Sequence, residues 1–348
     1  MYQLSIVLLS ALTWGSIVAK KRADWQKDVD DHNKKNKEWK SALSPDIDYE
    51  NEAVLKAMAN LKKDPTHAPK GDLQINNNDN TSSRLLQTVT LPAKLDLRVK
   101  YPKCWSIGHI RNQGQCGSCW AVSAMASLSD RYCISYSNST TTVQRSLSYQ
   151  DPLECCTTCG FASRGGCDGG YLHSAFEFAK NVGVVEGENH GNMTLCKPYF
   201  LSSSAPSAIA PACQKNCTNG TNSTTFYNAN KKYLVSYVLN DAWHYSYNVA
   251  KMITLMKTAL VLRGSIIAAI DVYDCFYRYS SGIYSRTGTI YIGGHAMKVI
   301  GYNDNSNGRY WIVANSWGTG WGMKGFIWIK MATSGVYIEY LSAEGNFK

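Results

Sequence analysis

A glycine-rich loop that runs straight into a helical sequence constrains the fold of this chain more than any other feature. The loop spans residues 113–120, and the small and apolar residues 121–128 continue it as a helix. Cys119 therefore lies at a helix start, where main-chain N–H groups and the helix dipole favour a thiolate and lower the thiol pKa below about 8.5. Because the thiolate is the reactive form, we predict that Cys119 is a nucleophile.

The cysteine content and the N-terminal sequence indicate a product of the secretory pathway, either secreted or held in a lysosome-like vesicle. The 348 residues include twelve cysteines, too many for a reduced cytosolic protein unless they bind metal. Residues 4–12 form a short apolar run that precedes a basic cluster at 20–22, so we expect a signal peptide over 1–19, with a buried N-terminal helix as the alternative. No later segment has the ~18 unbroken apolar residues of a membrane span, so we expect no membrane anchor.

The charge distribution argues against nucleic-acid binding. From residue 91 onward, 23 Lys and Arg face 14 Asp and Glu, a net charge of +9. These basic residues are scattered along the chain rather than clustered, which is typical of a soluble basic protein and not of a nucleic-acid surface. The chain also has six Asn-x-Ser/Thr sequons, of which we expect one or two to be glycosylated: Asn80, Asn138, Asn192, Asn216, Asn219 and Asn222.

Residues 20–90 differ in character from the rest of the chain, because they contain no cysteine and no pattern of strands. Residues 24–40 carry apolar positions at helical spacing, including Trp25, Val29 and Trp39, and a second helix is expected over 47–63. The following stretch, 71–83, is rich in Asn, Asp and Ser and is expected to be an exposed, cleavable linker. A solvated charged helix without any inhibitory role is the alternative interpretation.

Beyond residue 91 the pattern predicts an α+β fold with a helical half and a sheet half. Residues 104–230 alternate helices, one of them expected at 171–181, with cysteine-rich loops. From about 231 to 348, β-branched and aromatic runs bounded by Gly, Asn and Ser predict strands, interrupted by one helix at 248–262. The expected strands are 233–239, 265–273, 294–302, 310–314, 325–331 and 336–341.

His295 is the candidate base for Cys119. It follows two glycines, Gly293 and Gly294, which allow close approach of another chain, and it opens an expected strand. A lone histidine in that place is more often a satisfied structural residue. Asn315, twenty residues further on, favours a catalytic role for His295. Its side-chain carbonyl oxygen can accept a hydrogen bond from one imidazole nitrogen and leave the other nitrogen for Cys119, while the nearby Trp317 keeps water away from that bond.

These motifs together resemble the papain family of cysteine proteases. The resemblance rests on the Cys-Gly-Ser-Cys-Trp sequence of residues 116–120, on His295, and on the Asn-Ser-Trp-Gly sequence of residues 315–318. It implies two facing lobes, the second of them β-barrel-like, with the nucleophile on the first and its base on the second. It also implies that Gln113 helps to bind the oxyanion and that Gly169 and Gly170 form a wall that pairs with extended peptides, although a plain turn is the alternative for these glycines.

An insertion narrows the resemblance to cathepsin B-like enzymes. His295 lies 176 residues after Cys119, against roughly 130 to 150 in papain and cathepsins, and the surplus falls between residues 155 and 233. Cys275 is left over as a buried free thiol, with an intermolecular bridge as the alternative. A zinc site formed by cysteines 155, 156, 159 and 167 is the rival interpretation. The subfamily resemblance implies five disulfides: Cys104–Cys133, Cys116–Cys167, Cys155–Cys213, Cys156–Cys159 and Cys196–Cys217.

The resemblance implies a cysteine endopeptidase made as a zymogen. Residues 33–39 match the Asn/Trp segment of the family's propeptide, so residues 20–90 would inhibit a peptidase domain formed by 91–348. The partners implied are peptide and protein substrates, the chain's own propeptide and cystatin-like inhibitors, with no metal or cofactor. The alternatives are a cathepsin B-like dipeptidyl carboxypeptidase and a non-catalytic binding protein on the same scaffold.

Two further positions bear on the substrate. Leu341 aligns with the place where cathepsin B-like enzymes can carry an acidic residue, which predicts an apolar subsite for the second residue before the scissile bond. Residues 197–212 contain no histidine, whereas two adjacent histidines hold the substrate's carboxylate in cathepsin B. This absence predicts an endopeptidase, unless Lys197 or His190 substitutes for those histidines.

Overall fold

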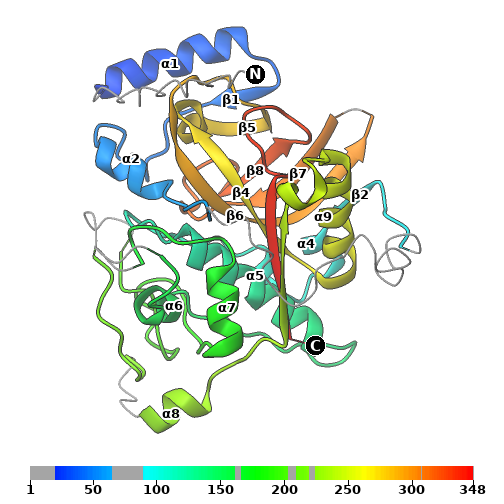
Figure 1. Ribbon diagram of the computed structural model, residues 1–348. Helices are drawn as coiled ribbons and strands as arrows, with labels where there is room; N and C mark the ends of the chain where they lie inside the picture. Colours follow the sequence, from blue (N-terminus) through cyan, green and yellow to red (C-terminus); the bar gives the residue numbers. More distant parts are fainter. Residues whose placement is uncertain are drawn as a thin grey trace, which may run out of the picture.

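Two lobes meet along a junction, and an N-terminal leader lies along the sheet lobe and reaches that junction (Figure 1). The computed structural model describes residues 20–64, 89–160, 166–202, 209–218, 224–306 and 308–347. The signal peptide expected at 1–19 and the linker expected at 71–83 lie outside these ranges. Within them, no helix combines the length and the apolar character that crossing a membrane requires.

The helical lobe is built around α5 (Cys119–Tyr136), whose small and apolar residues leave most of the helix buried. The expected helix after residue 119 is therefore confirmed. The helix expected at 171–181 begins three residues later, as α7 (Ser174–Asn181). The remaining helices of this lobe are short: α4 (Leu97–Lys100), η1 (Trp105–Ile107), α6 (Gln150–Cys155) and α8 (Thr224–Ala229).

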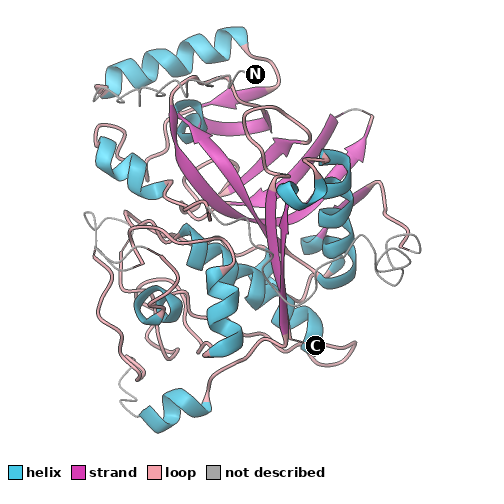
Figure 2. Ribbon diagram, in the orientation of Figure 1, coloured by secondary structure: helices cyan, strands magenta, loops and turns pink. Residues whose placement is uncertain are grey.

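The sheet lobe contains most of the strands of the chain, seen as the upper cluster in Figure 2. The strand order is β1-β5-β8-β7-β6-β4-β9-β3, where β1 (Trp39–Ser41) comes from the leader and β2 pairs with β6, so the described strands form an open path. The expected α+β fold with a helical lobe and a sheet lobe is confirmed, and the described strands follow an open path rather than a closed barrel. The elements are β2 (Lys94–Asp96), β3 (Ser236–Asp241), η2 (Ala242–Tyr245), α9 (Val249–Arg263), β4 (Ile266–Tyr273), η3 (Asp274–Arg278), β5 (Tyr279–Tyr284), β6 (Tyr291–Asn305), β7 (Gly308–Ala314), β8 (Phe326–Lys330) and β9 (Leu341–Asn346).

One expected strand is misplaced and another was missed. Residues 336–341 were expected to be a strand, but residues 335–340 form turns, with Tyr337 in the left-handed region at φ 58°, and the strand β9 starts only at Leu341. The sequence of β5, Tyr-Ser-Ser-Gly-Ile-Tyr, carries little strand signal because Ser and Gly interrupt its apolar residues. Its pairing with β8 and β1 places it in the sheet.

Buried ion pairs join the two lobes. Arg131 of α5 pairs with Glu344 of β9 at 2.6 Å, and Asp130 of α5 pairs with Lys298 of β6 at 3.0 Å. All four side chains are at most 3% exposed. Because a buried charge is costly without its partner, these contacts fix how α5 sits against the sheet.

The leader differs from its expected form. It contains α1 (Arg22–Lys35), β1 (Trp39–Ser41) and the short helix α2 (Glu52–Met58), where helices over 24–40 and 47–63 were expected. The first helix ends because the Asn36 side chain accepts hydrogen bonds from the main-chain N–H groups of Glu38 and Trp39, which turns the chain. Trp39 then enters the core of the sheet lobe, with its ring 5.2 Å from that of Tyr284, and β1 pairs with β5.

Candidate active site

Cys119 and His295 come from opposite lobes and meet at the junction. Cys119 is the first residue of α5, and His295 lies within β6; neither side chain is exposed. The main-chain N–H groups of Ala296, which follows His295, and of Trp120, which follows Cys119, both reach the Cys119 sulfur. The sheet and the helix start thus converge on one sulfur atom.

Asn315 orients His295. The Nε2 atom of His295 donates to Oδ1 of Asn315 at 2.7 Å, while Nδ1 has no hydrogen-bond partner among the described residues. The Trp317 ring lies 4.9 Å from the imidazole and shields this side of the hydrogen bond from water, and it stacks in turn on Tyr277 at 5.1 Å. With Nε2 engaged, Nδ1 is the nitrogen left to exchange a proton with Cys119.

Burial makes both reactive groups neutral in this form of the protein. It raises the pKa of Cys119 to about 11, even though four main-chain N–H groups favour the thiolate. It also lowers the pKa of His295 to about 4, against a smaller rise from the Asn315 hydrogen bond. The expectation that the helix start lowers the pKa of Cys119 is therefore wrong for this form, because the loss of water outweighs the helix N–H groups.

Gln113 lies beside the nucleophile, as the oxyanion role requires. Its side chain is fully buried, and Oε1 accepts from the Ser316 hydroxyl at 2.6 Å, which fixes the amide orientation. Nε2 donates to the carbonyl of Cys116 at 2.9 Å and to the carbonyl of Met58, in the leader, at 3.3 Å. A leader carbonyl thus takes the donor that a reacting carbonyl oxygen needs.

The leader crosses the junction through main-chain hydrogen bonds to both lobes. Leu61 N–H donates to the Gly294 carbonyl at 2.8 Å, and Lys62 N–H donates to the Gly170 carbonyl at 3.0 Å. Asn60 adds its own N–H to the Cys119 sulfur. A Cβ on Gly169 would lie 1.9 Å from the Asn60 carbonyl oxygen, so the bare backbone of this wall is what allows the approach.

A cavity of about 300 Å³ opens beside this crossing. Leu341 lines it, as do Leu172 and Ala269, and Leu61 of the leader packs in the same apolar cluster as these three residues. The structure therefore places Leu341 at an apolar cavity next to the glycine wall.

The structure contains the five disulfides that the resemblance implies: Cys104–Cys133, Cys116–Cys167, Cys155–Cys213, Cys156–Cys159 and Cys196–Cys217. The rival zinc site is wrong, because all four of its cysteines are used in these bridges. Cys275 is a buried free thiol, 3.1 Å from the Tyr284 hydroxyl.

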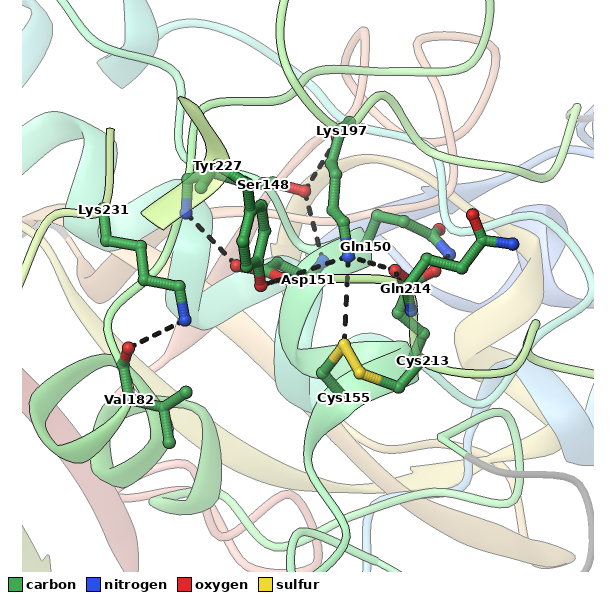
Figure 3. The surroundings of a disulfide bond; sticks show 12 residues. Ser148, Gln150, Asp151, Cys155, Val182, Lys197, Cys213, Gln214, Tyr227 and Lys231 are labelled. Atoms are coloured by element: carbon green, nitrogen blue, oxygen red, sulfur yellow. Dashed lines mark hydrogen bonds and ion pairs between the residues drawn. A yellow bond between two sulfur atoms is a disulfide. The ribbon is translucent and has the colours of Figure 1, made fainter. Parts of the chain in front are cut away.

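Lys197 is not available to hold a substrate carboxylate. Its side chain is fully buried and pairs with Asp151, at 3.3 Å, and with Glu154. Figure 3 shows its amine pointing at Asp151 beside the Cys155–Cys213 disulfide. His190 remains exposed, and its Nδ1 lies 3.2 Å from the Tyr199 carbonyl oxygen.

Sequence reasoning missed Tyr199 and the contact that Ser316 makes in the site. Tyr199 donates from its hydroxyl to the Gln113 carbonyl at 2.9 Å and lies equally close to the Ser118 hydroxyl, so it supports the loop before Cys119. Ser316 holds the Gln113 amide from the other lobe. Tyr199 has no sequence signal, and the motif that contains Ser316 does not show its contact with Gln113, because each contact spans more than eighty residues of chain.

Comparisons with known proteins agree with this geometry. Residues 91–343 match the family model described as papain family cysteine protease. "Cathepsin B-like cysteine proteinase 4" of Caenorhabditis elegans is 32% identical over 329 residues, covering 90% of this chain and 89% of the relative. The "Gut-specific cysteine proteinase" of the same organism is 37% identical over 265 residues, covering 74% of each chain.

A solved structure, "proCathepsin B S9 from Trypanosoma congolense", shares the fold. Its TM-score is 0.73 at 24% identity, and the match covers 95% of this chain and 99% of that one. The family match over residues 91–343 and the relatives above establish that this chain belongs to the papain family of cysteine proteases, among the cathepsin B-like cysteine proteinases.

Proposed function

We propose that the chain is the zymogen of a cysteine endopeptidase and that its leader, residues 20–90, is its own inhibitor. The observation that carries this proposal is the position of Met58 and Asn60. The Met58 carbonyl accepts a hydrogen bond from the side-chain amide of Gln113, and the Asn60 N–H points at the sulfur of Cys119. The leader thus occupies the two groups that a reacting peptide bond must reach.

After the leader leaves, water and substrate reach Cys119 and His295, and the burial that keeps both groups neutral is relieved. The Cys119 thiolate attacks the peptide carbonyl, and the oxyanion accepts from Gln113 Nε2 and from the Cys119 N–H. His295 as imidazolium then protonates the leaving amine. In the second half of the reaction, His295 takes a proton from water as the water attacks the thioester.

The apolar cavity lined by Leu341 supports a preference for a bulky apolar side chain at the second residue before the scissile bond. Five disulfides support passage through the secretory pathway, with secretion or a lysosome-like vesicle as the destination. The open groove of the mature enzyme is the surface that cystatin-like inhibitors would occupy.

An active-site label tests the catalytic proposal against a non-catalytic binding protein on the same scaffold. The matured protein is incubated with a thiol-directed epoxide, and the adduct is mapped by mass spectrometry. We expect the label on Cys119 and complete loss of hydrolysis, with little labelling of the zymogen because its Cys119 is buried and the pKa of that thiol is raised. A matured protein that hydrolyses peptides without any label on Cys119 would contradict the proposal.

The endopeptidase mode rests on the absence of a carboxylate clamp. Residues 197–212 contain no histidine, and Lys197 is buried in its own ion pairs. Without a cation that faces the groove from this loop, a free chain end gains no extra binding. We expect the matured enzyme to cleave a peptide amide and its free-acid twin at the same internal bonds. Stepwise release of dipeptides that requires the free acid would favour the dipeptidyl carboxypeptidase and identify His190 as the group to mutate next.

A further inference from the structure

The cavity beside the glycine wall extends beyond its apolar part. Next to Leu341 it is lined by tyrosine rings from Tyr247, Tyr337 and Tyr340, and by two carboxylates, those of Asp241 and Asp271. The described lining from residue 91 onward includes no Lys or Arg. The far part of the cavity is therefore both aromatic and acidic, in a domain whose net charge from residue 91 onward is +9.

The leader shows what such a surface accepts. Leu61 packs in the apolar part, and Lys63 places its amine 3.5 Å from the Asp271 carboxylate at the cavity wall. Residues two apart in an extended chain point to the same side, so Leu61 and Lys63 face the cavity together. Counted outward from Asn60 at the Cys119 sulfur, they take the second and fourth positions of the groove. The leader runs toward its C-terminus in this direction, opposite to a substrate, so it marks where side chains fit and not how a substrate's backbone lies.

We propose that this aromatic and acidic part of the cavity binds a lysine or arginine side chain at the fourth residue before the scissile bond, next to an apolar second residue. The inference rests on the proposed function and names its substrate class. An ammonium or guanidinium group there gains a carboxylate partner in Asp271 and can lie over the faces of Tyr247 and Tyr340. The Asp271 side chain is only 17% exposed, so its ion pair is less screened by solvent than one at the open surface.

The test uses matured enzyme and four-residue fluorogenic reporters of the form Xaa-Gly-Leu-Arg, with Xaa as Lys, Gln or Glu. We expect kcat/KM for the Lys reporter to exceed that for the Gln reporter by about fivefold, chiefly through KM, and the Glu reporter to be slowest. Asp271→Asn should bring the Lys and Gln reporters to within about twofold of each other. The charge-matched control Asp304→Asn removes a carboxylate that pairs with Lys257 and Arg309, outside the cavity lining, and should keep the fivefold preference.

A second variant covers the case in which Asp271→Asn fails to fold. Tyr247 has φ 57°, a conformation that glycine adopts without strain, so Tyr247→Gly removes the ring while relaxing the backbone. It should reduce the preference for Lys over Gln by about twofold, the share expected of an exposed cation–π contact. Equal rates for Lys and Gln in the wild type would overturn the inference, as would a preference that survives in Asp271→Asn. Faster cleavage with Arg in place of Leu at the second position would also overturn it.

These outcomes separate the inference from the function on which it rests. Hydrolysis of the Gln reporter by the wild type upholds the peptidase proposal whatever the residue at the fourth position does. If the matured protein reacts with the epoxide at Cys119 but cleaves no reporter, the peptidase proposal itself fails.

Discussion

The two lobes of this protein are held together by different means. The five disulfides all lie in the helical lobe, between Cys104 and Cys217. The sheet lobe has one cysteine, Cys275, and it is a free thiol. Apart from α5, the helices of the first lobe span eight residues or fewer, and helices so short have little stability of their own. The sheet lobe instead relies on strand ladders and an aromatic core that includes Trp311, Trp317 and Trp321.

The difference teaches where the precision of the site comes from. The nucleophile stands three residues after Cys116, which is bonded to Cys167 next to the glycine wall, so covalent bonds position Cys119. The base stands in the middle of β6, which pairs with β4 and β7, so hydrogen bonds position His295. Catalysis therefore needs Cys119 from the disulfide-bonded helical lobe and His295 from the hydrogen-bonded sheet lobe.

The largest expected effect is the loss of kcat when the nucleophile of one lobe or the base of the other is replaced. Cys119→Ser and His295→Ala each remove a group that does chemistry, and we expect each to lower kcat by about 10⁴-fold or more. Asn315→Ala removes only an orienting contact and should cost about 10- to 100-fold. Hydrolysis of a fluorogenic dipeptide reporter measures all three, with the exposed Asn138→Ala as a matched control. Near-normal turnover by His295→Ala would refute the idea that the sheet lobe supplies the base.

The disulfides should differ in importance according to the chain they enclose. Cys116–Cys167 spans 51 residues and Cys156–Cys159 spans three. Chain entropy then predicts a loss of about 4 kcal/mol in the free energy of unfolding for the double serine variant of the first bridge and about 2 kcal/mol for the second. Urea unfolding of the matured protein measures both. Equal losses would show that the loops are already ordered without their bridges, and would weaken the contrast between the lobes.

The smallest expected effect is a difference in the response to acid. Burial opposes ionisation of Glu188 in the helical lobe, but Arg111 and His109 outweigh it and lower its pKa to about 2. Its contribution to stability is thus fully present above pH 4.5 and is lost as the pH falls toward 2, about 2 kcal/mol of it between pH 5 and pH 3. In the sheet lobe, burial raises the pKa of Glu339, so protonation of that carboxyl stabilises the fold as the pH falls.

Urea unfolding at pH 5 and pH 3 measures this contrast in Glu188→Gln and Glu339→Gln. The first variant should lose part of the wild type's acid sensitivity, and the second should gain some. If both variants follow the wild type at both pH values, neither carboxyl is linked to folding as its surroundings indicate.

The site could be predicted from the sequence better than the contacts that support it. Cys119, His295, Asn315 and Gln113 were chosen from local motifs, and the structure brings them to one junction. Local motifs suffice there because Cys119 begins α5 and Asn315 directly follows β7, while His295, inside β6, is marked by the two glycines before it. Tyr199 carries no such signal, because its role comes from packing against a loop 86 residues away in the chain.

The neutral state of the reactive pair could not be predicted in the same way. A helix start favours a thiolate, and that reasoning holds for an exposed sulfur. We attribute the reversal to the leader, because Asn60 contacts the Cys119 sulfur and Leu61 N–H donates to the carbonyl of Gly294, the residue before His295. Trp39 shows the same limit: it has helical spacing in sequence, yet it becomes part of a strand because the sheet lobe offers a partner for it.

The pairing of β1 with β5 has a consequence for the fate of the mature enzyme. The leader supplies β1, and β1 is the outermost strand on its side of the sheet. When the leader is removed, β5 loses this partner, and its N–H and C=O groups on that side are left for water or for another chain. Unpaired strand edges are templates for intermolecular association. Maturation therefore exposes the edge of β5 as well as the substrate groove. The mature enzyme is then more prone to associate than its precursor, and the repulsion between its positive charges has to oppose that association.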